Sequence, residues 1–228
     1  MIVDAIIPAR NEQSTVASSV TAALACACVR EVSVVDDGSV DATADRARQA
    51  GAKVVERPDS AGSKAHAMAD GVARSDADAF LFVDADLIGI TSTHLDAICE
   101  PVLAGRVTMS VGLFDYGRFW NPQVRRWPPL SGERLVPRWI WDAVPPHQRD
   151  GYSIEMRINQ VVARHRCRTA VRTMTNVHHR NKRVKHGVVD GLRRTLAMYR
   201  ELVRVVWPFG DVSPRAYLHY LRALRIEG

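Results

Sequence analysis

The chain has 228 residues, of which 46% are hydrophobic and 25% are charged, so its composition is that of a globular protein with a sizeable core rather than of a disordered chain. No apolar run approaches the roughly 20 residues that span a bilayer, and the first residues lack the basic and apolar segments of a signal peptide. We therefore expect a cytoplasmic protein, and contact with a membrane surface stays open.

The net charge of +6 is distributed unevenly. Residues 1–105 carry 8 Lys and Arg against 16 Asp and Glu, a net charge of −8, whereas residues 106–228 carry 23 against 9, a net charge of +14. A basic half suits nucleic acid, anionic lipid or a phosphorylated small molecule. Neither a helix-turn-helix nor an aromatic single-strand platform is evident, so we expect no nucleic-acid partner.

The first half alternates strands with helices. In chain order, the pattern predicts a strand at 2–7, a helix through 16–24, a strand at 31–35, a helix between an N-cap at Ser39 and Gly51, a strand at 52–55, a helix at 64–73 and a strand at 79–83. This alternation is typical of an α/β fold with a parallel, doubly wound sheet.

The second half is less regular. We expect a helix at 93–103, a strand at 107–114, a long loop at 115–132, helices at 134–144 and 152–163, an edge strand at 168–174, and helices from about residue 188 with a break at 207–210. The last helices are amphipathic, and their apolar side fits packing on the core or in a homodimer, with membrane-surface contact as the alternative.

Two carboxylates follow the apolar strand at 79–83. Asp84 and Asp86 alternate along an extended chain, so both side chains point to the same side. Ligands of an open parallel sheet bind beyond the carboxyl ends of its strands, where polar residues 10–12 and Asp36-Asp37 also lie. Two hard oxygen ligands suit Mg²⁺ or Mn²⁺, and a solvated turn with two surface aspartates is the simpler alternative.

The four cysteines are Cys26, Cys28, Cys99 and Cys167. Their spacing along the chain matches neither a zinc motif nor a redox Cys-x-x-Cys motif. We therefore expect reduced cysteines with a structural role.

Several of these motifs together resemble a known family. Residues 7–12 (IPARNE), residues 35–43 (VDDGSVDAT) and Asp84-Ala85-Asp86 resemble the nucleotide-sugar half of the GT-A glycosyltransferases, family 2 in particular. Residues 129–134, 151–155 and 179–181 look like the branch of glucosyl-3-phosphoglycerate synthases. The resemblance implies a Rossmann-like, mostly parallel twisted sheet flanked by helices. It divides the chain into a catalytic domain at 1–185, with a nucleotide-sugar half (1–105) and an acceptor half (106–185), and a C-terminal helical extension at 186–228.

The resemblance also implies donor-binding residues. The residues that would contact a nucleotide-sugar donor are Pro8, Ala9, Asn11, Glu12, Asp37, Lys64, Asp84 and Ala85. A UDP-sugar is favoured, and a GDP-sugar stays open as the alternative. Asp37 would accept the imide hydrogen of uracil, because a carboxylate is only an acceptor; capping of the next helix is the alternative role. Lys64 would lie near the phosphates at a helix N-terminus, or else be a solvated surface lysine.

The metal ligands implied by the resemblance come from both halves of the chain. Asp86 would bind Mn²⁺ or Mg²⁺, and His179 would complete the ligand set. Imidazole suits Mn²⁺ better than Mg²⁺. Because His178 is adjacent, the choice between the two histidines stays open.

Two glutamates are candidates for catalysis, together with Asp84. An inverting transfer needs a general base, for which Glu133 or Asp150 is placed, whereas a retaining transfer would use Glu155 to hold the donor sugar. Capping of a helix is the simpler role for either glutamate, and the stereochemical outcome stays open.

The loop at 115–132 is the expected entrance for the acceptor. Its arginines Arg118, Arg125 and Arg126 could clamp a phosphate or carboxylate in a bidentate manner, or be plain surface residues. The loop is shorter than we expect for the phosphoglycerate-using enzymes, and Val177 stands where their arginine is expected.

The sequence as a whole predicts a metal-dependent glycosyltransferase. The expected reaction moves a sugar from a UDP-sugar donor to a small acceptor that is phosphorylated or lipid-linked. A sugar nucleotidylyltransferase is a weaker alternative, because the turn after the first strand, at residues 8–12, contains no glycine. The other alternative is a catalytically idle module that binds a nucleotide sugar.

Overall fold

The protein is described by a computed structural model that covers residues 1–60, 62–115, 131–149, 154–180 and 214–226. Within these ranges, eight strands form one sheet in the order β10-β8-β6-β7-β4-β1-β2-β3, and two short strands, β5 and β9, pair separately.

The elements of the first half follow the predicted alternation. They are β1 (Val3–Ala9), α1 (Val16–Leu24), β2 (Val29–Asp36), α2 (Thr43–Gln49), β3 (Lys53–Glu56), α3 (Lys64–Ala73), β4 (Ala79–Phe82), β5 (Leu87–Ile88) and α4 (Ser92–Leu103). The pairs β1–β2, β1–β4 and β2–β3 are all parallel, as the doubly wound pattern predicts.

The second half completes the same sheet. Its elements are β6 (Met109–Phe114), β7 (Arg134–Pro137), α6 (Arg138–Asp142), the 3-10 helix η1 (Pro146–Gln148), α7 (Ile154–Arg164), β8 (Thr169–Met174), β9 (His178–His179), α9 (Pro214–Ala223) and β10 (Leu224–Ile226). Strand β7 runs antiparallel to both of its neighbours, β4 and β6, so the sheet is mostly parallel.

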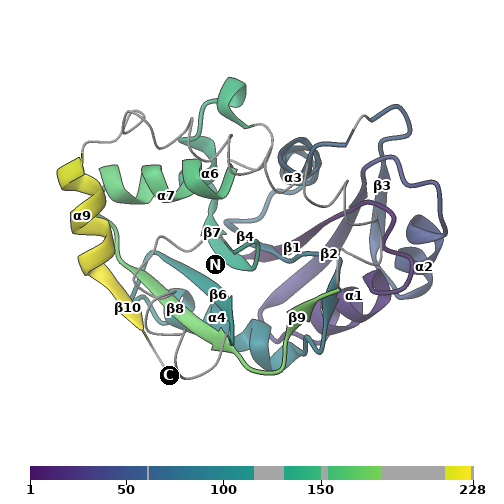
Figure 1. The fold of residues 1–228 in the computed structure, drawn as a ribbon, viewed down its shortest axis with the longest axis horizontal. Coiled ribbons are helices and arrows are strands. Elements are labelled where there is room, and N and C mark those ends of the chain that lie inside the picture. Colours follow the sequence, from purple (N-terminus) through teal and green to yellow (C-terminus); the bar gives the residue numbers. More distant parts are fainter. Residues whose placement is uncertain (61, 116–130, 150–153, 181–213, 227–228) are drawn as a thin grey trace, which may run out of the picture.

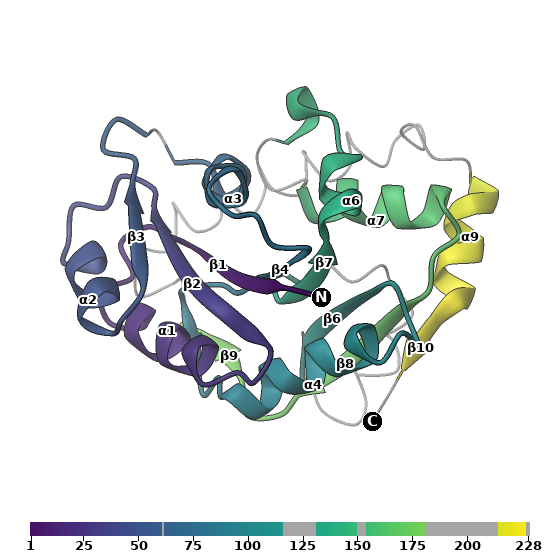
Figure 2. The ribbon, with the colours of Figure 1, turned by 180° about the vertical axis from the view of Figure 1, so that it is seen from behind.

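Helices cover both faces of the sheet (Figures 1 and 2). Helices α1 and α4 pack on one face, where the core contains Val16, Val20, Leu95 and Ile98. Helices α3, α6 and α7 cover the other face, where the core contains Met68, Phe82, Trp141 and Ile158. Strand β4 lies between these layers and is buried along its whole length, which explains its continuous apolar sequence.

The predicted helix at 134–144 is wrong in its first four residues. Residues Arg134–Pro137 form strand β7, and only Arg138–Asp142 are helical. The strand is buried at every position and pairs with β4 on one side and β6 on the other. This pairing over long sequence distances overrides the helical pattern of the segment.

Two smaller predictions are also corrected. Strand β8 was expected at the edge of the sheet, but it lies between β6 and β10. Ser39 was expected to cap the helix before Gly51, but α2 begins four residues later, at Thr43. The Ser39 hydroxyl instead accepts a hydrogen bond from the backbone N–H of Asn11, so it connects two loops.

The C-terminal residues that the structure describes pack into the same domain as the rest of the sheet. Strand β10 pairs in parallel with β8, and the Tyr220 side chain of α9 is buried in the core beside α7. The proposed division at residue 185 falls outside the described ranges and stays a prediction. Among the described helices, none combines the length and the apolar character needed to cross a membrane.

Candidate active site

The loops that follow β1 and β2 are joined by hydrogen bonds at the carboxyl edge of the sheet. The Asn11 side chain accepts from the backbone N–H of Val40, and the backbone N–H of Glu12 donates to the Thr43 hydroxyl at 2.8 Å. Asn11 has a φ of 55°, a left-handed conformation that asparagine tolerates better than most residues. These bonds place the predicted donor-binding residues Asn11 and Glu12 beside the loop that carries Asp37.

Pro8 and Ala9 end strand β1 at the same edge. In the β1–β2 register Pro8 lies opposite Val35 and Ala9 opposite Asp36. The carbonyl of Ala9 accepts a hydrogen bond from the backbone N–H of Asp37 at 2.8 Å, which extends the pairing beyond the strand.

Asp37 is buried and held by three groups. One carboxylate oxygen accepts hydrogen bonds from the guanidinium of Arg57 and from the hydroxyl of Ser60, and the other accepts from the backbone N–H of Ser63 at 2.5 Å. Ser63 is the N-cap of α3, so Asp37 connects β2 to that helix rather than capping α2. The sequence did not point to Arg57, because no local pattern links it to Asp37.

Lys64 joins two acidic side chains that are far apart in sequence. Its ammonium lies 2.6 Å from Oδ1 of Asp84 and 3.0 Å from Oε1 of Glu155, and its side chain is only 25% exposed. Burial alone lowers the pKa of Lys64, but the charges of Asp84 and Glu155 outweigh it and raise the pKa above the usual range. The helix start at Lys64 is confirmed, and the alternative of a solvated surface lysine is wrong.

Gly132 lies against the cluster of Lys64, Asp84 and Glu155, where a larger residue would not fit. A Cβ atom at Gly132 would lie 2.5 Å from Oδ1 of Asp84 and 2.6 Å from Nζ of Lys64, which is closer than real Cβ contacts. Residue 132 immediately precedes two buried residues, Glu133 and Arg134. Glycine at 132 therefore allows this chain segment to approach the Asp84 carboxylate.

The pairing of β5 with β9 brings His179 to Asp86. His179 lies opposite Leu87 in this antiparallel pair, and its Nδ1 is 2.9 Å from Oδ1 of Asp86. Burial lowers the pKa of His179, and the hydrogen bond and charge of Asp86 reverse this effect and raise it. His178 is exposed on the other side of the strand, so the structure brings the second histidine to the carboxylates and not the first.

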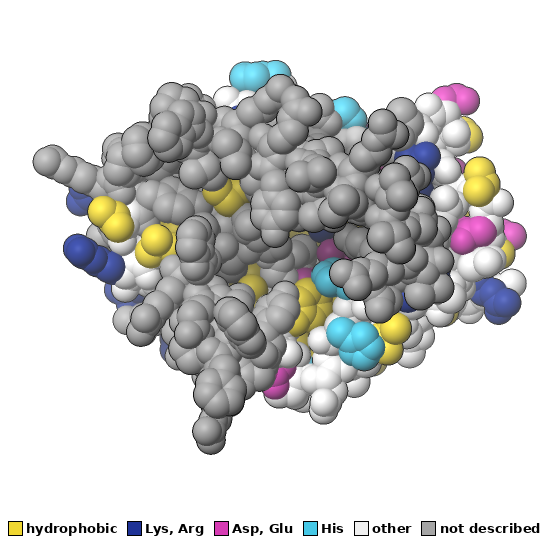
Figure 3. Space-filling model, viewed as in Figure 1, with side chains coloured by type: hydrophobic (Ala, Val, Ile, Leu, Met, Phe, Trp, Pro, Cys, Tyr) yellow, Lys and Arg dark blue, Asp and Glu magenta, His cyan; other side chains and the backbone are white. Residues whose placement is uncertain are grey.

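The carboxylates and the imidazole form one cluster. Ligand atoms of Asp84, Asp86 and His179 all lie within 4.8 Å of one another. Figure 3 shows acidic and histidine side chains close together on this face of the molecule. Two carboxylates and an imidazole are a donor set that fits a divalent ion such as Mn²⁺. Ala85, between the two aspartates, is buried in the core, and the Ser19 hydroxyl donates to the carbonyl of Asp84 at 3.1 Å.

Glu133 lies inside the protein next to this cluster. Its side chain is fully buried, and one oxygen accepts from the Ser131 hydroxyl while Oε1 finds no hydrogen-bond partner within the described ranges. Burial first, and then the negative charge of Asp84, raise the pKa of Glu133 to about 7. A carboxyl group with this pKa changes its protonation state near neutral pH.

Arg134 supports the second half of the site. Its guanidinium is fully buried and donates to the carbonyls of Ser131 and Glu155 and to the side chain of Asn159. It thereby fixes the backbone on both sides of the acidic cluster. The sequence does not point to Arg134, because its segment has the pattern of a helix.

Four predicted residues lie outside the described ranges. They are the acceptor arginines Arg118, Arg125 and Arg126 and the alternative base Asp150. Their roles stay predictions.

Fold and site together define the class of protein. A mostly parallel sheet flanked by helices, with two aspartates and a histidine clustered beyond the end of β4, fits the GT-A glycosyltransferase fold that the sequence predicts. The family model for glycosyl transferase family 2 matches residues 4–167, and the chain belongs to this family.

Solved structures show the same fold. Glucosyl-3-phosphoglycerate synthase from Mycobacterium tuberculosis in complex with phosphoglyceric acid has a TM-score of 0.74 and 23% identity, covering 92% of this chain and 80% of that one. The same enzyme in complex with Mn²⁺, uridine-diphosphate-glucose and phosphoglyceric acid has a TM-score of 0.71 and 25% identity, covering 88% and 76%. A mycobacterial protein has a TM-score of 0.63 and 26% identity, covering 78% and 67%. No curated protein matches the sequence.

Proposed function

We propose that this glycosyltransferase moves a sugar from a UDP-sugar donor to a small anionic acceptor in a reaction that depends on Mn²⁺ or Mg²⁺. The observation that carries this proposal is the cluster of Asp84, Asp86 and His179 at the carboxyl edge of the sheet. A similar solved enzyme binds Mn²⁺, uridine-diphosphate-glucose and phosphoglyceric acid, which supports each part of the proposal.

The residues that would hold the ion are Asp86 and His179. Both offer ligand atoms from partly buried side chains, and the pairing of β5 with β9 fixes their distance before any ligand arrives. When bound, the ion would supply positive charge to stabilise the departing diphosphate. An imidazole ligand favours Mn²⁺ over Mg²⁺.

The donor sugar would bind beside Lys64. Asp84 and Glu155 offer carboxylate oxygens that can accept hydrogen bonds from sugar hydroxyls, and Lys64 holds both acids in place. Asp37, fixed by Arg57, would accept from the base of the nucleotide at the other end of the site.

The burial of Glu133 argues against this residue as the base of an inverting reaction, and the other candidate base, Asp150, lies outside the described ranges. A general base must contact the acceptor hydroxyl, whereas the Glu133 side chain is fully buried and accepts a hydrogen bond from the Ser131 hydroxyl. Glu155 accepts a hydrogen bond from Lys64, which also contacts Asp84. This placement suits a residue that holds the donor sugar. We therefore assign Glu155 to sugar positioning and Glu133 to electrostatic stabilisation of the Lys64 ammonium. Nuclear magnetic resonance assignment of the product anomer tests this choice.

The acceptor is proposed to be anionic because of the charge of the second half. Residues 106–228 carry a net charge of +14, which attracts a phosphate or carboxylate group. Lipid linkage of the acceptor, contact with a membrane surface and a homodimer remain predictions from the amphipathic C-terminal pattern.

Titration calorimetry with UDP tests the proposal. The full-length protein should bind UDP much more tightly with Mn²⁺ than without, and an Asp86→Asn variant should lose this difference. Asp76→Asn is the matched control, because Asp76 is 84% exposed at the opposite end of β4. Equal affinity with and without Mn²⁺ would contradict the proposed metal dependence.

A panel of nucleotide sugars with phosphorylated and carboxylated acceptors then tests turnover. Transfer from a UDP-sugar is the expected result. Tight binding with no transfer or hydrolysis for any donor would indicate the idle module, and release of pyrophosphate from a nucleoside triphosphate would indicate a nucleotidylyltransferase.

A further inference from the structure

Three of the four cysteines meet at a place far from the candidate active site. Cys26 and Cys28 lie on the turn between α1 and β2, and Cys99 lies on α4. Their sulfur atoms are all within 4.8 Å of one another, and those of Cys26 and Cys28 are 3.6 Å apart. Because this turn precedes β2, the cluster lies at the amino edge of the parallel strands, opposite to the edge that carries Asp84 and Asp86.

The spacing of the sulfur atoms suits a thiolate metal site. A tetrahedral ion with metal–sulfur bonds of about 2.3 Å holds its sulfur ligands about 3.8 Å apart. The separation of Cys26 and Cys28 is close to this value, and all four cysteines of the chain are free thiols. The folded chain therefore brings three sulfur ligands together without a large rearrangement.

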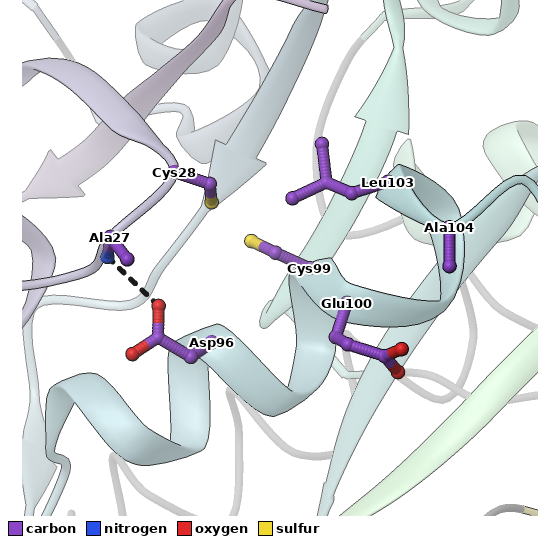
Figure 4. Close-up of a pocket in the computed structure, with 7 residues that line it drawn as sticks. All are labelled: Ala27, Cys28, Asp96, Cys99, Glu100, Leu103 and Ala104. Carbon is purple, nitrogen blue, oxygen red and sulfur yellow. Dashed lines mark hydrogen bonds between the residues drawn. The ribbon is translucent and has the colours of Figure 1, made fainter.

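The surroundings also suit a bound ion. Cys26 and Cys99 are buried, whereas Cys28 is partly exposed and lines a pocket of about 430 Å³ together with Cys99 and Asp96 (Figure 4). An ion can thus enter from solvent, and a fourth ligand position can face the pocket.

Asp96 holds the turn in place. Its Oδ1 accepts hydrogen bonds from the backbone N–H of Ala27 at 2.9 Å and from the Cys26 thiol at 3.1 Å. The dashed line in Figure 4 marks the first of these bonds. The carboxylate therefore holds the turn against α4 and adds negative charge that attracts a cation.

We propose that Cys26, Cys28 and Cys99 bind a thiophilic divalent ion, with Zn²⁺ as the test ion, separately from the ion of the transfer reaction. Soft thiolate ligands select such ions, whereas the carboxylates of the other site suit Mg²⁺ or Mn²⁺. The bound ion links the α1–β2 turn to α4 and so stabilises the fold. It plays no direct part in sugar transfer.

Titration of the reduced, metal-free, full-length protein with Co²⁺ tests the proposal. Thiolate ligation gives a charge-transfer absorption in the near ultraviolet that carboxylate and imidazole ligands do not give. We expect this band to saturate at one equivalent per chain at the thiols and to be displaced by Zn²⁺. The Asp86→Asn variant should keep the band, which separates this site from the proposed catalytic ion.

Cysteine variants locate the ion. Cys28→Ser should remove the band and weaken Zn²⁺ binding by roughly 100-fold or more, because a hydroxyl replaces a thiolate. Cys167→Ser is the matched control, since Cys167 lies outside the cluster and contacts the carbonyl of His165. This variant should keep the absorption band and the Zn²⁺ affinity of the wild-type protein. No band in the reduced wild-type protein, or a band that persists in Cys28→Ser, would overturn the proposal.

Alkylation of the wild-type protein tests Zn²⁺ binding by Cys28 without a variant. Mass spectrometry after brief alkylation should show that Zn²⁺ protects Cys28 and leaves Cys167 as reactive as before. Equal reactivity of Cys28 with and without Zn²⁺ would overturn the proposal.

Discussion

The imidazole Nδ1 of His179 lies 2.9 Å from Oδ1 of Asp86, although the two residues are 93 positions apart in the chain. The short strands β5 and β9 create this contact by pairing just beyond the end of β4. Gly89, with a φ of +81°, allows the approach, because a Cβ there would lie 2.3 Å from the carbonyl oxygen of Asn176. The candidate metal ligands thus depend on a small second sheet beside the main one.

The two adjacent histidines should behave differently when mutated. His179→Ala is expected to weaken Mn²⁺-dependent UDP binding by at least about tenfold, because it removes a ligand atom from the cluster. His178→Ala should leave the affinity unchanged, since that side chain is exposed on the same strand. Calorimetry with UDP and Mn²⁺ measures both variants, and a larger loss for His178→Ala would contradict the assignment.

Gly132→Ala should impair the site more than the fold. The added Cβ would displace the flexible ends of Asp84 and Lys64, and a displacement of about 1 Å in a reacting constellation lowers activity by roughly 100-fold. Gly105→Ala is the control, because no atom lies within 4 Å of an added Cβ there, although Gly105, unlike Gly132, has a positive φ. The control should lose a little stability and keep its activity. Steady-state kinetics and thermal unfolding separate the two effects, and equal activity of both variants would refute the predicted clash.

Removing the Lys64 ammonium should destabilise the protein. Lys64→Met leaves Asp84 and Glu155 without their shared cation, and we expect a loss of about 2 kcal/mol, less than for a fully buried pair because the lysine is 25% exposed. Lys53→Met removes a surface pair with Glu31 and should cost less than about 1 kcal/mol. Urea unfolding of both variants measures the difference. Equal stability losses would show that the Lys64 cluster does not contribute as described.

The buried Glu133 should make stability depend on pH. Its pKa is raised to about 7 in the folded state from 4.5, so the folded protein binds the proton more tightly than the unfolded chain does. Stability is then greatest below about pH 4.5 with respect to this group and falls as the pH rises through 7. Glu133→Gln removes the titration, so the wild-type protein should lose roughly 1–3 kcal/mol more than the variant between pH 5 and pH 8. Thermal unfolding across this range checks the prediction, and parallel curves would contradict it.

Local patterns predicted most of the first half correctly. The apolar run of β4, the helix that starts at Lys64 and the acids at the strand ends are all properties of neighbouring residues, and the structure confirms their elements. The prediction failed at Arg134, whose segment has a helical pattern but is paired on both sides within the sheet. Sheet pairing joins residues that are distant in the chain, and no local pattern encodes it.

The α/β class, the Asp-x-Asp at the end of a buried strand and the resemblance to family 2 follow from the sequence, because each depends on residues that are close together in the chain. Three other features require the folded structure: His179 rather than His178 faces Asp86, Arg57 holds Asp37, and three cysteines with no recognised spacing meet. These contacts depend on which strands pair and how the helices pack on them. Their partners lie tens of residues apart, so the folded backbone and not the order of neighbouring residues sets their geometry.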